Sequence, residues 1–456
     1  MMTLGELASA IEGATTDSPA TRIDSVSTDS RTLSAGALFV ALRGPRFDGH
    51  DHAQQARQRG AAALMVERPV AVDLPALRVP DSRRALGLAA AHWRSRFSLP
   101  VAAVTGSNGK TTLTQMVGSI LARAYGERDG RKHWLATRGN LNNDIGLPLM
   151  LFDLTSAHRA AVFELGMNHL GEIAELAQMA RPTVAVVNNA QREHQEFLDS
   201  PQATARENGA VLASLPPDGV AVFPADDPCA PIWRDLSGSR RMIDFALTAT
   251  AAVTARYRPA DGGSQIRIST PIGPIETKLA LAGAHNVHNA LAATACGLGL
   301  GLPPEMIGEG LAAFRAVAGR GTRLATARGA TVIDDSYNAN PDSVRAAIDL
   351  LAGETPPRLL VLGDMGEVGH QGPAFHREVG SYARERGIES LLAAGPLSRE
   401  AVLAFGAGAR HFEQVEDLIA AVTPLATCGT VLVKGSRFMR MERVVQAIAG
   451  GTADGH

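Results

Sequence analysis

The sequence predicts an α/β protein of three domains, and three observations support this. Short apolar runs typical of buried parallel strands alternate with longer stretches of helical periodicity. A length of 456 residues is that of about three domains. A glycine-bearing turn joins a strand to a helix near residue 105, which is typical of a nucleotide-phosphate site. We therefore expect a small α/β domain at 1–82, a central ATPase-like domain with a parallel sheet at 83–314 and a second doubly wound domain at 315–456.

The N-terminal 82 residues contain two apolar runs, 37–42 and 61–66, which predict strands, with a helix expected over 49–59 between them. Before the first run, residues 27–31 are dense in hydroxyl groups and end in an arginine. Such a cluster could hold a diphosphate or a sugar, but it fits loop and cap chemistry equally well.

A strand at 100–104 is expected to lead through a glycine turn into a helix at 111–125. Gly106 and Gly109 allow backbone conformations that a Cβ would block, so that several N–H groups can point at one anion. The start of the following helix adds free N–H donors and partial positive charge. The turn therefore predicts a phosphate loop, and a tight turn that binds nothing is the alternative.

Two side chains at the end of this loop suit a nucleotide and its metal ion. Lys110 can reach the terminal phosphates, and the Thr111 hydroxyl is placed to bind Mg²⁺. The pattern departs from the usual phosphate loop because Val104 stands where a glycine is expected.

Two further strands of the central domain are expected to end in polar residues at the same edge of the sheet. Residues 159–163 lead to Glu164, and residues 182–187 lead towards His194. Ligands of open parallel sheets gather at the carboxyl ends of the strands, and a carboxylate there suits Mg²⁺. A helix cap is the alternative role for Glu164. The amide-rich segment 137–148 indicates a loop that recognises a polar substrate, or else an ordinary surface loop.

The C-terminal part repeats the alternation of strands and helices. Strands are expected at 331–333, 358–362, 390–393 and 430–433, and helices at 376–386 and 439–448. The first strand ends in two aspartates, a tyrosine and two asparagines, which suit a ribose and an adenine. The alternative is a turn with a helix cap at Asp342 or Ser343.

Net charge, apolar stretches and cysteine content narrow the range of partners and compartments expected for the protein. A net charge of −2 does not favour nucleic acid or an anionic membrane as partner. The first residues lack the pattern of a signal peptide, and the uncharged stretch 279–304 contains histidines and asparagines that favour a buried segment over a membrane span. Cys229, Cys296 and Cys428 lie far apart, which predicts neither disulfides nor a zinc site and indicates a cytoplasmic protein. Only four of the 44 basic residues are lysines.

With these motifs, the sequence resembles the Mur ligase family, the ATP-dependent amide-forming ligases of cell-wall precursor synthesis. The resemblance extends from residues 27–31 to residues 434–437. It implies a domain for a UDP-sugar substrate, a central ATPase domain and a Rossmann-like C-terminal domain. Residues 139–146 and 334–341 are similar to those of the member that adds D-alanyl-D-alanine to a UDP-N-acetylmuramoyl-tripeptide. That reaction would proceed through an acyl phosphate, in a monomer that needs no nucleic acid or membrane insertion.

The resemblance also implies roles for individual residues. Catalytic roles fall to Lys110, Glu164, His194 and Arg320, and Mg²⁺ would be bound by Thr111, Glu164 and His194. ATP would be bound by Thr105, Gly106, Ser107, Asn108, Gly109, Lys110, Thr111, Thr112, Asn289, Arg320, Asp335, Tyr337 and Asn338. The other substrates would be bound by Ser27, Ser30, Arg31, Asn140, Asn142 and Asn143.

Two alternatives and one departure remain. Another ligase of the superfamily, such as a folylpolyglutamate synthase, would share the ATP site but not the first domain, and a catalytically inactive nucleotide-binding protein is the second alternative.

Many Mur ligases carry a lysine, carbamoylated by CO₂, about a dozen residues after the motif histidine. Here no lysine lies between Lys132 and Lys278, and Asn208 is expected at that position. A second Mg²⁺ would then be held by water and by Glu207.

Overall fold

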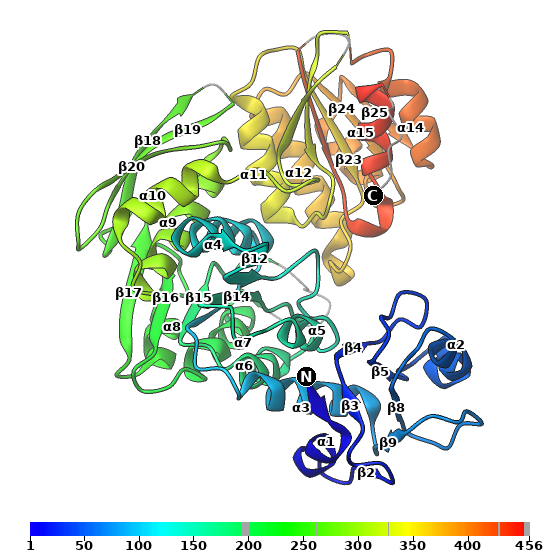
Figure 1. The fold of residues 1–456 in the computed structure, drawn as a ribbon. Coiled ribbons are helices and arrows are strands. Elements are labelled where there is room, and N and C mark those ends of the chain that lie inside the picture. The colour runs from blue at the N-terminus through cyan, green and yellow to red at the C-terminus, as the bar shows by residue number, and fades with distance from the viewer. Residues whose placement is uncertain (193–199, 261, 327, 427–428, 451–456) are drawn as a thin grey trace.

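The fold was analysed in a computed structural model, which describes residues 1–192, 200–260, 262–326, 328–426 and 429–450. Three sheets of five or more strands organise these residues, and helices flank each sheet (Figure 1). We call the parts of the chain around these sheets the N-terminal, central and C-terminal units. The α/β fold predicted from the sequence is confirmed. Within the described ranges, no helix is both long and apolar enough to cross a membrane.

The N-terminal unit is built on a five-stranded sheet. Its strands lie in the order β2 (Thr15–Thr16), β9 (Ala76–Arg78), β8 (Ala63–Val66), β5 (Ala37–Val40) and β4 (Ser25–Ser27). The remaining elements are β1 (Met2–Thr3), α1 (Leu4–Ala10), β3 (Arg22–Ile23), β6 (Arg43–Gly44), β7 (Phe47–Asp48), η1 (Gly49–His52), α2 (Ala53–Gln58) and α3 (Ser82–Arg94). The two expected strands are β5 and β8, and the expected helix over 49–59 is divided between η1 and α2.

The central unit is built on a nine-stranded sheet. Its order is β13 (Trp134–Ala136), β14 (Ala160–Glu164), β10 (Val101–Thr105), β15 (Val184–Val187), β16 (Val220–Pro224), β17 (Arg241–Ala246), β18 (Val253–Ala260), β19 (Gly263–Ser269) and β20 (Ile275–Leu279). Pairing is parallel from β13 to β18, and β19 and β20 add an antiparallel extension that the sequence did not lead us to expect. A separate hairpin consists of β11 (Glu127–Arg128) and β12 (Arg131–Lys132).

Helices cover both faces of this sheet because alternate strand residues point to opposite sides. Val101 and Ala103 contribute to one apolar cluster, whereas Ala102 and Val104 contribute to the other. The helices of this unit are α4 (Lys110–Tyr125), α5 (Gly146–Phe152), α6 (Glu172–Ala180), α7 (Pro201–Ala213), α8 (Ala230–Ser237), α9 (Ala284–Gly299) and α10 (Pro304–Ala313). The uncharged stretch 279–304 forms mainly the buried helix α9, as expected.

The C-terminal unit is built on a six-stranded sheet. Its order is β21 (Thr322–Ala325), β22 (Thr331–Asp335), β26 (Thr430–Lys434), β23 (Arg358–Gly363), β24 (Ser390–Ala394) and β25 (Ala409–Phe412), with only β21 antiparallel. Its helices are α11 (Pro341–Ala352), η2 (Gly369–Gln371), α12 (Gly372–Glu385), α13 (Arg399–Phe405), α14 (Val415–Val422), η3 (Arg437–Met439) and α15 (Glu442–Ala449). All four expected strands are present.

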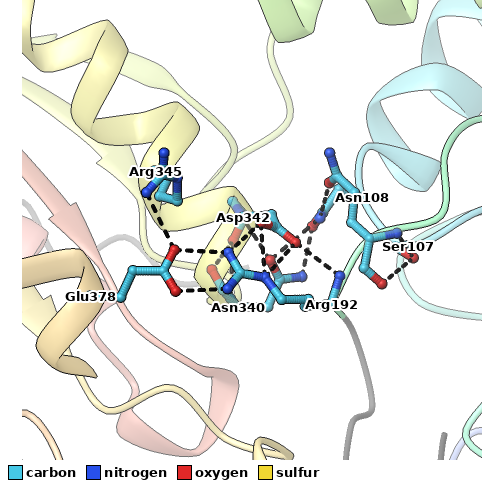
Figure 2. A network of polar contacts seen from close by, with 9 residues as sticks. Ser107, Asn108, Arg192, Asn340, Asp342, Arg345 and Glu378 are labelled. Carbon is cyan, nitrogen blue, oxygen red and sulfur yellow. Dashed lines mark hydrogen bonds and ion pairs between the residues drawn. The ribbon is translucent and has the colours of Figure 1, made fainter. Parts of the chain in front are cut away.

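The three units meet at the central one. In Figure 1 the C-terminal unit lies above the central unit and the N-terminal unit lies below it. One apolar cluster contains Leu38 and Leu77 of the N-terminal sheet, Leu86 of α3 and Phe163 of the central sheet, so these two units share a core. The contacts between the central and C-terminal units include a network of polar side chains (Figure 2).

Candidate active site

The phosphate loop, residues 105–110, lies between the end of β10 and the start of α4. Gly109 has a φ of 79°, and a Cβ on it would lie 2.5 Å from Asn289 Oδ1. Gly106 has a φ of 133° and packs against the backbone of Asn188. Both positions therefore require glycine. Because α4 begins at Lys110, its free N–H groups and positive end lie at this loop.

Asparagine side chains that follow β15 hold the loop. Asn188 Nδ2 donates to the Asn108 carbonyl at 2.7 Å and to Asn289 Oδ1 at 2.8 Å. Asn189 Oδ1 accepts from the Asn108 N–H at 2.8 Å. Since β10 pairs in parallel with β15, the two strand ends lie side by side, and these bonds fix the backbone of the loop.

The Lys110 side chain lies over its own loop. Its Nζ donates to the Gly106 carbonyl at 2.6 Å and to the Ser107 carbonyl at 3.1 Å. An anion bound at the loop N–H groups can exchange for these carbonyls, because an ammonium has three donors and forms stronger bonds to charged oxygens.

Glu164 ends β14, directly beside the strand that leads into the phosphate loop. Its side chain is buried, and its Oε1 accepts from Asn142 Nδ2 at 2.7 Å. Among the described residues, Oε2 of Glu164 has no hydrogen-bond partner. A buried, unpaired carboxylate oxygen is costly unless a cation binds it, and Thr111 also lines the space in front of it. The donor set of a carboxylate and a hydroxyl fits Mg²⁺ completed by water.

The C-terminal unit contributes an ion pair at two neighbouring strand ends. Lys434, at the end of β26, has its Nζ 2.6 Å from Asp335 Oδ2 at the end of β22. The same ammonium donates to the Asn338 carbonyl at 2.9 Å. Lys434 is only 4% exposed, so its ammonium is withdrawn from solvent and fixes the Asp335 carboxylate.

Two arginines approach the ring of Tyr337. The guanidinium of Arg320 lies 4.1 Å from the ring centroid, and that of Arg437 lies 5.8 Å from it. Cation–π attraction at the shorter distance holds the ring and the guanidinium together. An adenine would meet a ring that already contacts Arg320.

These groups line one cleft with a volume of about 1230 Å³ between the central and C-terminal units. The predicted residues that line it are Ser107, Asn108, Gly109, Lys110, Thr111, Thr112, Asn140, Asn142, Asn143, Glu164, Asn289, Arg320, Asp335, Tyr337 and Asn338. Thr105 and Gly106, the first two residues of the loop, do not line the cleft, and Thr105 Oγ1 donates to Asn208 Oδ1 at 2.6 Å. His194 lies outside the described residues. No three histidine, cysteine, aspartate or glutamate side chains form a metal cluster within the described ranges.

The predicted N-terminal substrate residues do not line this cleft. Ser27 Oγ accepts from the Asp29 N–H at 3.1 Å, and Arg31 donates to the Asp29 carboxylate from its backbone N–H and twice from its guanidinium. Arg31 lowers the pKa of Asp29 to about 2. Ser30 Oγ donates to Gln55 Oε1 at 2.6 Å. These contacts order the loop after β4 and leave its role in substrate binding a prediction.

Several cleft residues were not among the predicted site residues. Lys434 could have been found, because it is one of four lysines and follows an apolar strand. His288 gave no such signal: it lines the cleft from α9, and burial lowers its pKa although Asp226 at 4.0 Å opposes the shift. The alternative interpretation, a turn with a helix cap at Asp342 or Ser343, is wrong about the cap residue, because Asn340 caps α11 and Ser343 completes the capping box.

The role expected of Glu207 in binding a second Mg²⁺ stays a prediction. Both oxygens of its carboxylate accept backbone N–H groups at the start of α6, from Gly171 at 2.9 Å and from Ile173 at 3.0 Å. Its charge therefore stabilises the positive end of α6. Asn208 is fully buried. Its Oδ1 accepts from the Thr105 hydroxyl, whereas its Nδ2 has no hydrogen-bond partner among the described residues.

Comparisons with known proteins agree with this arrangement. Three family models match: "Mur ligase family, catalytic domain" over residues 22–94, "Mur ligase middle domain" over 104–297 and "Mur ligase, glutamate ligase domain" over 319–437. The UDP-N-acetylmuramoyl-tripeptide–D-alanyl-D-alanine ligase of Escherichia coli (strain K12) is 40% identical over 452 residues, which are 98% of each chain.

Solved structures are similar over nearly the whole chain. A crystal structure of MurF from Acinetobacter baumannii has a TM-score of 0.91 and 33% identity, and 99% of each chain is covered. The MurF ligase from Thermotoga maritima in complex with ADP has a TM-score of 0.82 and 25% identity, covering 94% of this chain and 97% of that one.

Proposed function

This chain belongs to the Mur ligase family, and we propose that it joins D-alanyl-D-alanine to a UDP-N-acetylmuramoyl-tripeptide with ATP, in the synthesis of peptidoglycan precursors. The observation that carries this proposal is the similarity of the whole chain, the N-terminal unit included, to the E. coli enzyme of that name. Similarity over residues 22–94 also argues against the folylpolyglutamate synthase alternative, which would not share this unit.

Each predicted domain has its own binding role in the proposed reaction. Residues 1–82 bind the UDP-sugar through Ser27, Ser30 and Arg31, residues 83–314 bind the ATP phosphates, and residues 315–456 bind the nucleoside. The amide-rich loop with Asn140, Asn142 and Asn143 faces the peptide. We also infer a monomer in the cytoplasm, and the two described cysteines, which are buried and unbridged, suit a reducing compartment.

The peptide carboxylate is a poor electrophile and must first be activated. A carboxylate oxygen of the peptide attacks the γ-phosphorus of ATP, ADP leaves, and an acyl phosphate forms. The dipeptide amine then attacks the acyl carbon, and phosphate leaves as the amide forms. Lys110 and the loop N–H groups stabilise charge on the transferred phosphoryl group, and the fixed strand ends hold the reactants in line.

Mg²⁺ would be held by Thr111, Glu164 and His194, and when bound it neutralises charge on the phosphates. The buried Oε2 of Glu164 supports this assignment. Arg320 would contact a phosphate, Asn289 the adenine and Asp335 the ribose, whereas Tyr337 and Asn338 would flank the adenine.

The test is to measure ATP-dependent phosphate release with D-alanyl-D-alanine and each of two UDP-N-acetylmuramoyl-tripeptides, one ending in diaminopimelate and one in lysine. We expect phosphate and the pentapeptide product with one or both tripeptides. Omission of the dipeptide should abolish product, and replacing the tripeptide substrate with a folate should give no phosphate. Activity with folate and glutamate alone would overturn the proposal.

A further inference from the structure

A network of charged side chains joins the central and C-terminal units beside the cleft (Figure 2). Arg192, which follows β15, contacts Asp342 at the start of α11 and Glu378 on α12. Its Nη2 lies 2.6 Å from Asp342 Oδ1, and its Nη1 lies 2.7 Å from Glu378 Oε2. The Arg192 backbone N–H also donates to Asp342 Oδ2 at 2.9 Å. One guanidinium therefore binds two carboxylates of the other unit, and we call these three residues the clasp.

The clasp is more than a surface ion pair. The side chain of Arg192 is 24% exposed, that of Asp342 22% and that of Glu378 32%. Partly buried bidentate pairs are stronger and less screened by salt than exposed ones. The guanidinium also lies 5.2 Å from the ring centroid of Phe375, which fixes its orientation.

A second contact reaches the same helix end from the phosphate loop. Asn340, which caps α11, donates through Nδ2 to Asn108 Oδ1 at 2.8 Å. The start of α11 is therefore held both by the phosphate loop and by Arg192. This helix begins shortly after Asp335, Tyr337 and Asn338, which line the cleft. The position of these residues relative to Lys110 thus depends on where α11 is held.

Arg192 and Glu378 do not line the cleft, whereas Asp342 does. We propose that Arg192 is a positioning residue, which clasps the C-terminal unit onto the phosphate loop and so raises the fraction of the enzyme whose ATP site is complete. This inference rests on the proposed function. A ligand that needs both units binds with an apparent affinity reduced by the fraction of molecules in which they are apart.

The test compares Arg192→Ala with a matched control, Arg345→Ala. Arg345 also contacts Glu378, at 3.3 Å, but it lies on α11 in the same unit as Glu378. We expect Arg192→Ala to raise KM for ATP on the order of 10-fold, a normal size for coupling between two sites, while KM for the UDP-sugar substrate is unchanged. Arg192→Lys should recover part of the loss, and Arg345→Ala should behave like the wild type.

Two further measurements separate a clasp from a role in folding. Adding Glu378→Ala to Arg192→Ala should raise KM for ATP no further, because the partners act as one unit. Small-angle scattering of the ligand-free protein should show a larger radius of gyration for Arg192→Ala than for Arg345→Ala. Equal KM values and equal radii for Arg192→Ala and the wild type would overturn the inference. If Arg192→Ala does not fold, Arg192→Lys and Glu378→Gln replace it in the same cycle.

The kinetic and scattering measurements together distinguish failure of the clasp from failure of the proposed function. A wild-type protein that releases no phosphate would remove the kinetic arm, but the scattering comparison needs no activity. A larger radius for Arg192→Ala would then support the clasp without the ligase reaction. An active enzyme whose radius and KM for ATP do not respond to Arg192 would refute only the clasp.

Discussion

At the scale of single residues, Lys110 has the clearest chemical assignment. It begins α4, and its ammonium lies over the carbonyls of Gly106 and Ser107 at the mouth of the cleft. We predict that Lys110→Ala lowers the rate of phosphate release by at least about 10²-fold, the scale for a lost electrostatic donor in a transition state. Lys132→Ala is the control, because Lys132 lies in the exposed hairpin β11–β12. Near-normal turnover of Lys110→Ala would exclude this loop as the phosphate site.

Asn208 leads to a second prediction at this scale. An amide cannot form a carbamate, and Asn208 is fully buried with its oxygen bound to Thr105. Arginine cannot replace a carbamoylated lysine either, since its guanidinium stays protonated. We therefore expect turnover in CO₂-depleted buffer to equal turnover with added bicarbonate at each Mg²⁺ concentration. Reproducible stimulation by bicarbonate would contradict this.

At the scale of elements, the sequence predicted strands made of continuous apolar runs more reliably than strands with an alternating pattern. Apolar runs such as 37–42 and 358–362 became β5 and β23 because a buried strand needs a continuous apolar stretch. The strands β19 and β20 were missed because only continuous apolar runs were interpreted as strands, whereas these two alternate buried and exposed residues. β19 pairs antiparallel with β18, and β20 pairs antiparallel with β19.

The candidate site also contains residues that the sequence could identify and residues that it could not. Glycine and lysine spacing locates the phosphate loop, since few other structures need those residues together. The carboxylate of Glu207 could not be assigned from sequence, because its two N–H partners at the start of α6 come from a segment some 35 residues away in the chain. The arginine clasp has no local signature at all, because its three members meet only when two units pack.

The loop between β23 and α12 gives a pH-dependent prediction. His376 is fully buried; its Nδ1 lies 2.7 Å from the Gly372 carbonyl, to which it donates as the neutral tautomer, and its Nε2 accepts from the Met365 N–H at 3.0 Å. Burial lowers the pKa of His376, although Asp364 at 3.9 Å opposes the shift. Protonation would break the bond from Met365. Its contribution to stability is therefore present above the unfolded pKa of about 6.5 and is lost as pH falls below it.

We expect the C-terminal unit of the wild type to lose up to about 1.4 kcal/mol of stability per pH unit below about 6.5 through this histidine. Calorimetric unfolding at pH 7.5 and 5.5 would measure this loss, and His376→Gln should reduce the pH dependence. His370→Gln is the matched control, because His370 is exposed on η2. An identical pH dependence in both variants would contradict the assignment.

At the scale of the whole molecule, the proposed ATP site is shared between two units. Lys110 belongs to the central unit, and Asp335 and Lys434 belong to the C-terminal unit. A site divided in this way can open and close by rotation of one unit. We predict that an ATP analogue and the tripeptide substrate together make the enzyme more compact in small-angle scattering. No compaction at saturating ligand would count against a closing motion.

The order of the phosphate loop before any ligand is present has a calorimetric consequence. Asn188 and Asn189 already fix the backbone of Asn108, so nucleotide binding need not order this loop. An ordered loop loses little conformational entropy on binding, and contact with charged phosphates buries little apolar surface. Titration with pyrophosphate alone should therefore release heat with almost no change in heat capacity. A negative heat-capacity change that appears only when the sugar nucleotide is added would then report the apolar area that the units bury against each other.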